Sequence, residues 1–125
     1  MTDQQIEDDI QAKGLTAPRV TPDDVQAAIV GAVCFTAAEG VKGHWIENGI
    51  KAGAPGDKPD GPLNLLTFCV LTLSNGFTVT GESACASPEN FDAEIGRKIA
   101  RQNAEAKVWP LLGFRLRDSL HAAAA

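Results

Sequence analysis

The chain has 125 residues and a mass of 13.1 kDa, which leaves room for one hydrophobic core, and its 44% apolar and 22% charged residues are typical of a folded globular domain. A formal net charge of −5 argues against a protein that coats a nucleic-acid duplex, because such proteins neutralise phosphates with clustered Lys and Arg. No apolar run reaches the ~18 residues of a spanning helix and the polar, acidic start does not resemble a signal peptide, so we expect neither a membrane protein nor a secreted one.

The first 19 residues are predicted to be a flexible appendage. Ile6 and Ile10 stand four positions apart among polar residues, which favours a short amphipathic helix that ends at Gly14. A helix of this length is marginally stable on its own in water, so it either docks on the domain or frays. The single domain is placed at residues 20–117, and a frayed tail is expected at 118–125.

A short helix and a strand are predicted to open the domain. Thr21 has the residue type of a helix N-cap, Pro22 suits the first helical position, and Asp24 completes a capping box with Thr21. The β-branched residues of 29–36 then indicate a strand.

Residues 37–62 are expected to be irregular. The last ten of them, 53–62, hold three Pro and three Gly, which excludes a helix and indicates an exposed loop. Trp45 and Ile46 precede this loop, and they either pack back on the core or form part of a contact surface.

A β-hairpin is the clearest element in the sequence. Residues 65–73 form an apolar run, and residues 77–80 alternate apolar and polar side chains. Between them stands Asn75-Gly76, the dipeptide typical of a type I′ turn. The two runs are therefore predicted to pair as antiparallel strands.

The main helix is predicted to begin at Ser87 as N-cap and to end before Pro110. The residues expected to face the sheet are Phe91, Ile95, Ile99 and Ala106. Residues 111–116 would add a short closing strand. The predicted fold class is α+β: an antiparallel sheet built on a central β-hairpin, packed on one face by one long C-terminal helix and by a short N-terminal helix.

Motifs for catalysis and metal binding are missing from the sequence. It contains no nucleophile elbow, Walker loop, dinucleotide fingerprint or zinc-protease motif. The three cysteines are widely spaced without a CxxC pair, which predicts buried, reduced thiols, and with only two histidines a structural zinc site is not expected. We therefore expect no enzyme, no catalytic residue, no cofactor and no metal.

The outer face of the main helix is one candidate binding site. Arg97 and Arg101 are four positions apart, with Lys98 beside them, so their guanidinium groups are placed to grip a phosphate or a carboxylate. The alternative is that Lys98 pairs with Glu94 and Arg101 with Glu105 along a solvated helix.

The hairpin tip is a second candidate. Asn75 and Phe77 would present an amide and an aromatic ring to a planar base. The structural alternative is that the turn requires Asn75 and that Phe77 belongs to the core.

Several runs of the sequence resemble a known family. Residues 69–85, 88–100, 107–111 and 113–116, with the opening at 20–25, resemble the gene-49/gene-66 product family of small tailed-phage proteins. The resemblance implies a phage or prophage origin and action in the cytoplasm of the host bacterium. The family has no assigned activity.

The predicted outline is also similar to that of the phage Thoeris anti-defence sponges, which bind cyclic ADP-ribose or cyclic nucleotide signals at subunit interfaces without cleaving them. This resemblance implies a homo-oligomer whose arginines hold phosphates, while a phenylalanine stacks on adenine and an asparagine reads the edge of that base. The residues predicted to bind such a ligand are Asn75, Phe77, Asn90, Phe91, Arg97, Lys98 and Arg101. The alternative is a phage accessory protein that acts through protein contacts, with Trp45, Ile46 and the following loop as its surface.

Overall fold

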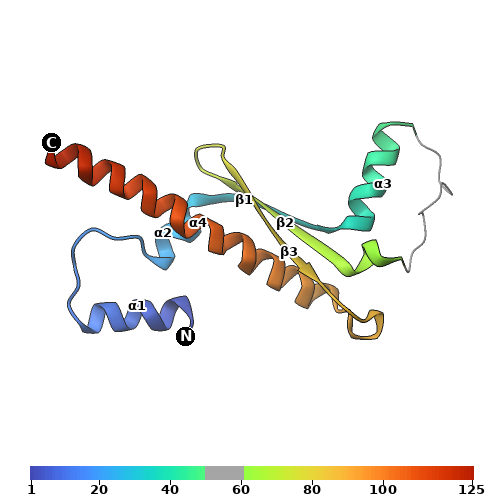
Figure 1. The fold of residues 1–125 in the computed structure, drawn as a ribbon, viewed down its shortest axis with the longest axis horizontal. Coiled ribbons are helices and arrows are strands. Elements are labelled where there is room, and N and C mark those ends of the chain that lie inside the picture. Colours follow the sequence, from blue (N-terminus) through green and yellow to red (C-terminus); the bar gives the residue numbers. More distant parts are fainter. Residues whose placement is uncertain (50–60) are drawn as a thin grey trace.

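A computed structural model describes residues 1–49 and 61–125 of the chain. The predicted loop at 53–62 lies outside the described residues except for its last two positions. The elements in chain order are α1 (Asp3–Ala12), α2 (Pro22–Ala28), β1 (Ile29–Thr36), α3 (Ala37–Glu47), η1 (Pro62–Leu65), β2 (Leu66–Leu73), β3 (Thr78–Ala84), η2 (Pro88–Asn90) and α4 (Ala93–Ala124). Figure 1 shows α4 running along the sheet, with α1 and α2 near one end of the molecule and α3 at the other.

The three strands form one antiparallel sheet in the order β1-β2-β3, so the predicted α+β class is confirmed. The predicted hairpin joins β2 to β3, but its turn is not type I′. A type I′ turn needs positive φ at two central residues. Here only Gly76 has it, at 88°, and the Leu73 N–H donates to the Phe77 carbonyl oxygen at 2.8 Å. The connection is therefore a three-residue loop with Gly76 in the left-handed region.

Helix α4 covers one face of the sheet through a stripe of residues spaced four apart. These residues are Gly96, Ala100, Ala104, Val108 and Leu112, and all of them are buried. Opposite the stripe, a Cβ atom on Gly81 would lie 2.2 Å from the Ala100 carbonyl oxygen and 2.3 Å from the Ala104 nitrogen. The backbones of α4 and β3 therefore pack closely, because neither side carries a large side chain at the crossing.

The main helix packs on the sheet as predicted, but the prediction of which helix residues face the sheet is wrong. Ile95 and Ile99 are exposed, and Ala106 is exposed as well. The large apolar side chains of Ile95 and Ile99 suggested a buried face. The small residues that follow them, Gly96 and Ala100, face the sheet instead, because only small side chains let the helix approach β3 so closely.

The predicted end of the main helix before Pro110 is also wrong. Helix α4 continues through Pro110, so residues 111–116 are helical rather than a closing strand, and the expected tail at 118–125 is helical as far as Ala124. Proline removes one backbone N–H from the helix ladder. The buried side chains of Val108 and Leu112, on either side of it, keep the same stripe packed on the core.

Residues 37–47, which were expected to be irregular, form α3. The Thr36 side chain accepts a hydrogen bond from the Glu39 N–H at 3.2 Å, and the Glu39 carboxylate accepts one from the Thr36 N–H at 3.2 Å. This capping box is the sequence signal that the prediction overlooked. On α3, Trp45 is half-buried, whereas the Ile46 side chain is 79% exposed.

Among the helices of the described residues, none is both long and apolar enough to cross a membrane.

Candidate functional site

The structure separates the seven predicted binding residues into two groups. Asn75 and Phe77 lie at the hairpin tip, whereas Asn90, Phe91, Arg97, Lys98 and Arg101 lie at the opposite end of the sheet and on the first turns of α4. Gly96 on α4 contacts Thr67, which marks the base of the hairpin, while Leu112 reaches its tip. The rise of ~1.5 Å per helical residue puts these two positions roughly 24 Å apart, so one small ligand does not contact both groups.

The charged residues at the base of α4 are largely paired along the helix. Lys98 Nζ lies 3.1 Å from Glu94 Oε1, and Arg101 Nε lies 2.7 Å from Glu105 Oε1. The alternative of pairing along the helix is therefore confirmed for these two cations. Arg97 is exposed and has no ion pair within residues 1–49 and 61–125.

A cleft of about 320 Å³, called here the tip cleft, lies between the hairpin tip and the C-terminal half of α4. Its lining includes both predicted residues of the tip, Asn75 and Phe77, together with Phe114, Arg115 and Asp118 of α4. Phe77 and Phe114 are 56% and 72% exposed as whole residues, so both present apolar surface to solvent at this cleft. This volume is within the ~300–1,000 Å³ range of small-molecule sites.

A second cleft of about 410 Å³, called here the arginine cleft, adjoins the first. It is lined by Arg19, Asp24, Ser74, Arg115 and Ser119, with apolar residues of α2 and α4 between them. Ala28, Ser74, Leu112 and Arg115 line both clefts. The two clefts are therefore neighbouring parts of one site, and Arg115 lies where they meet.

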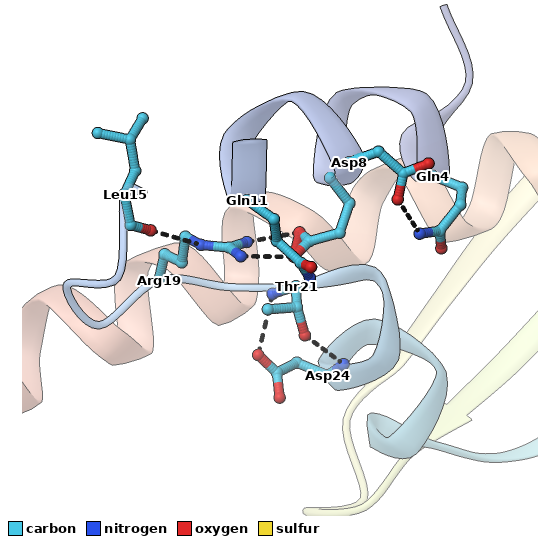
Figure 2. Close-up of polar contacts among 8 residues, drawn as sticks. Gln4, Asp8, Gln11, Leu15, Arg19, Thr21 and Asp24 are labelled. Atoms are coloured by element: carbon cyan, nitrogen blue, oxygen red, sulfur yellow. Dashed lines mark hydrogen bonds and ion pairs between the residues drawn. The ribbon is translucent and has the colours of Figure 1, made fainter. Parts of the chain in front are cut away.

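Arg19 in the arginine cleft is held by the N-terminal helix. Its two terminal nitrogens each donate to one oxygen of the Glu7 carboxylate at 2.5 Å, and its Nε donates to the Leu15 carbonyl oxygen at 3.4 Å. Figure 2 shows the Arg19 guanidinium pointing under α1, beside the Thr21–Asp24 capping box. The hydrogen bonds from Arg19 lower the pKa of Glu7, whose side chain is buried. Glu7 therefore remains ionised and offsets the charge of Arg19.

The charge of Arg115 has no such partner. Within the described residues its guanidinium makes no ion pair, although Asp118 lines the same cleft. Asp24, the acid of the arginine cleft, accepts the Thr21 N–H at 2.9 Å and belongs to the helix cap. Arg115 is therefore the cation of this site that is placed to meet an anionic ligand.

Asn75 combines a role in the turn with a role at the cleft. Its side-chain oxygen accepts the Phe77 N–H at 3.0 Å, which leaves the amide N–H groups as donors at the tip. The structural alternative for Asn75 is therefore confirmed, because the turn uses its side-chain oxygen, and the residue also lines the tip cleft.

Sequence reasoning missed Phe114 and Arg115 because it assigned residues 111–116 to a strand. The signal available was the helical spacing of Leu112, Arg115 and Ser119, which continues past Pro110. Once α4 is extended, these three positions share the side that faces α2 and the hairpin tip.

The cysteines line neither of the two clefts. All three are free, and Cys69 is fully buried beneath α4, opposite Cys34 on β1. Burial raises the pKa of Cys69 to about 12, and a hydrogen bond with Cys34 adds to this. The Cys69 thiol therefore stays protonated at neutral pH. Residues 1–49 and 61–125 also hold no group of three or more His, Cys, Asp or Glu side chains that could bind a metal ion.

The comparisons with known proteins identify a family. The model of the phage protein (N4 Gp49/phage Sf6 gene 66) family matches residues 20–120, so the chain belongs to this family, as the sequence resemblance implied. No curated protein and no solved structure matches the chain. The match includes α2, the sheet and most of α4, and thus both clefts except for Arg19, which lies one residue before it.

Proposed function

We propose that the protein binds a nucleotide-type immune signal, such as a cyclic nucleotide or a cyclic ADP-ribose, at the two adjoining clefts. It would sequester the signal without cleaving it, in the cytoplasm of the infected bacterium, and so counteract host defence against the phage. The observation that carries this proposal is the position of Arg115, which lies between an aromatic cleft and a polar one.

The tip cleft suits a planar base. Phe77 and Phe114 come from the hairpin and from α4, so a base at this cleft has two exposed rings within reach for stacking. Asn75 supplies amide donors, and the Asp118 carboxylate supplies an acceptor for the exocyclic amine of adenine. In such a site the rings would hold the flat ligand by stacking, and the few polar groups beside them would fix its orientation.

The arginine cleft suits a phosphate. Arg115 offers a guanidinium without an ion pair in the described residues, and the Ser74 hydroxyl lines the same wall. Charge-assisted hydrogen bonds from arginine to phosphate are about twice as strong as neutral ones. Because Arg115 lines both clefts, a ligand with its base in one cleft and its phosphate in the other would contact Arg115 with both groups.

Sequestration requires affinity and no catalytic group. The one fully buried thiol is protonated at neutral pH, and the residues that line the clefts offer stacking, hydrogen bonding and charge. These features support binding of an intact ligand.

Thermal denaturation against a panel of cyclic nucleotides and cyclic ADP-ribose isomers tests the proposal. A ligand at a hundredfold its dissociation constant should add ~2.7 kcal/mol to stability, which shifts Tm by several degrees. Arg115→Ala should abolish the shift. Arg97→Ala removes an equally exposed arginine from the far end of the same helix and should leave the shift unchanged.

Two outcomes contradict this assignment. If no ligand of the panel shifts the Tm of the wild-type protein, the nucleotide-binding function is contradicted. A shift that Arg97→Ala abolishes and Arg115→Ala retains moves the site to the predicted set at the base of α4. Recovery of intact ligand after denaturation distinguishes sequestration from degradation.

A second candidate function is action through protein contacts, and one observation favours it. Ile46 on α3 is 79% exposed and stands next to the half-buried Trp45, so α3 presents apolar surface to solvent. If α3 docks on a phage or host protein, Ile46→Asp should remove that protein from a pull-down out of infected cells. An unchanged pull-down counts against this function.

A further inference from the structure

The face of the sheet opposite α4, called here the outer face, carries exposed residues on all three strands. Residues on the strands alternate between the two faces, and those that point away from the buried core belong to the outer face. They are Gly31, Val33 and Phe35 of β1, Leu66, Phe68, Val70 and Thr72 of β2, and Thr78, Thr80, Glu82 and Ala84 of β3. Among the described helices, α3 lies over one end of it, where Gly40 approaches the ring of Phe35.

The outer face is apolar along β1 and β2. Val33 is 56% exposed, and it pairs across the strands with Val70. Next to this pair the rings of Phe35 and Phe68 lie 6.0 Å apart between centroids. A contiguous apolar surface on a sheet is stable in water only when another layer covers it, so this surface is suited to a partner.

The outer face carries almost no charge, although the chain has a net charge of −5. Among the described strand residues that form it, Glu82 has the single ionisable side chain, at the β3 edge. Two copies of an acidic protein repel each other, and this repulsion is smallest where both surfaces are neutral. A neutral apolar surface is also complementary to itself, which a twofold interface requires.

The edge of the sheet is less suited to pairing with a second copy. The register of β1 shifts between Ile29 and Gly31, so Val30 is an extra residue in this edge strand. Such a bulge interrupts the row of backbone groups that a new strand would need. The observations therefore favour contact through the face of the sheet.

We propose that the outer face is the interface of a homodimer, in which the sheets of two copies pack face to face across a twofold axis. Val33, Val70 and the Phe35–Phe68 pair form its apolar centre. Thr72 adjoins this centre on β2, two residues from Val70, and Thr78 and Thr80 of β3 lie toward its rim. Each copy keeps α4 on the side away from the interface, so both clefts stay open to ligand.

Sedimentation equilibrium without added ligand tests the dimer. The wild-type protein should have a mass of about 26 kDa, twice the 13.1 kDa of the chain. Val33→Glu places a charge at the centre of the outer face and should reduce the mass to that of one chain. The matched control is Ile95→Glu, because Ile95 is also 56% exposed but lies on α4, on the other side of the sheet, and this variant should remain a dimer.

A wild-type protein that stays monomeric over a wide range of concentration overturns the proposal, and so does a dimer that persists in Val33→Glu. If Val33→Glu does not fold, Thr72→Glu on the central strand replaces it and is judged by the same two criteria, because Thr72 is exposed on the same face. The measurement contains no nucleotide. Its failure therefore leaves the test of ligand binding unaffected.

Discussion

The two halves of α4 use the same residue types for different purposes. In the N-terminal half, residues 93–108, small side chains press against β3 and the cations Lys98 and Arg101 pair with glutamates of the same helix. In the C-terminal half, residues 109–124, the helix lies beside α2 and the hairpin tip, and Arg115 lines two clefts without an ion pair in the described residues. Arg97 in the N-terminal half also has no ion pair in the described residues, but it lines neither cleft. An arginine on a helix is thus a candidate for ligand binding when its charge is unpaired and it also lines a cleft.

The close packing of the N-terminal half gives the largest expected effect. Gly81→Ala adds a Cβ atom that would lie 2.2 Å from a backbone oxygen of α4, so strand and helix must move apart. We expect the free energy of unfolding to fall by about 3 kcal/mol, the upper range for overpacking, as measured by urea denaturation.

Gly113→Ala in the C-terminal half is the matched control for this change. A Cβ atom at Gly113 meets no atom within 4 Å. Alanine is the better helix former, so stability should rise by up to ~1 kcal/mol. Equal effects of the two variants would show that α4 and β3 do not pack as closely as described.

The arginine cleft beside the C-terminal half of α4 should respond to acid, because Glu7 of α1 holds Arg19 at this cleft. Because Arg19 lowers the pKa of Glu7 in the folded protein, the ion pair stabilises the docked α1 above the ordinary glutamate pKa of ~4.3. This stabilisation is lost as the pH falls through the lowered pKa, when the carboxylate becomes protonated. In an NMR titration, the Glu7 carboxyl signal and the terminal N–H signals of the Arg19 guanidinium should therefore shift at a pH below that ordinary value.

Glu7→Gln has no charge to titrate at this position and should remove the acid-dependent shift while the rest of the spectrum is preserved. A wild-type Glu7 carboxyl signal that titrates at the ordinary value would contradict the ion pair. That result would leave both Arg19 and Arg115 unpaired beside the arginine cleft.

The smallest expected effect belongs to the exposed ion pairs of the N-terminal half. Lys98→Ala removes the pair with Glu94, and such pairs on solvated helices contribute ~0.3–0.5 kcal/mol. The urea midpoint should change only slightly, and ligand binding should be unaffected. A loss of binding in this variant would show that the predicted set at the base of α4 is used after all.

Local sequence patterns were sufficient where the structure depends on neighbours in the chain. The capping box at Thr21 and the hairpin around Asn75-Gly76 could be predicted, because turns and caps are decided by a few adjacent residues. The long C-terminal helix was predicted too, but its N-cap is Asp92 and not Ser87, which precedes the short helix η2. Asn75 and Phe77 were singled out for the same reason, and both line the tip cleft.

The tertiary structure decided how far α4 extends and which of its sides meets the sheet. Proline at 110 signals a helix end locally, yet the burial of Val108 and Leu112 keeps the helix intact. Only packing against Gly81 selects the stripe of small residues over Ile95 and Ile99 as the side that faces the sheet.

The site depends on the same packing. The sequence alone determined the phage family, the fold class and the turn residues, whereas the meeting of Arg115 with the hairpin tip arises from contacts between segments about 40 residues apart, which no local pattern encodes.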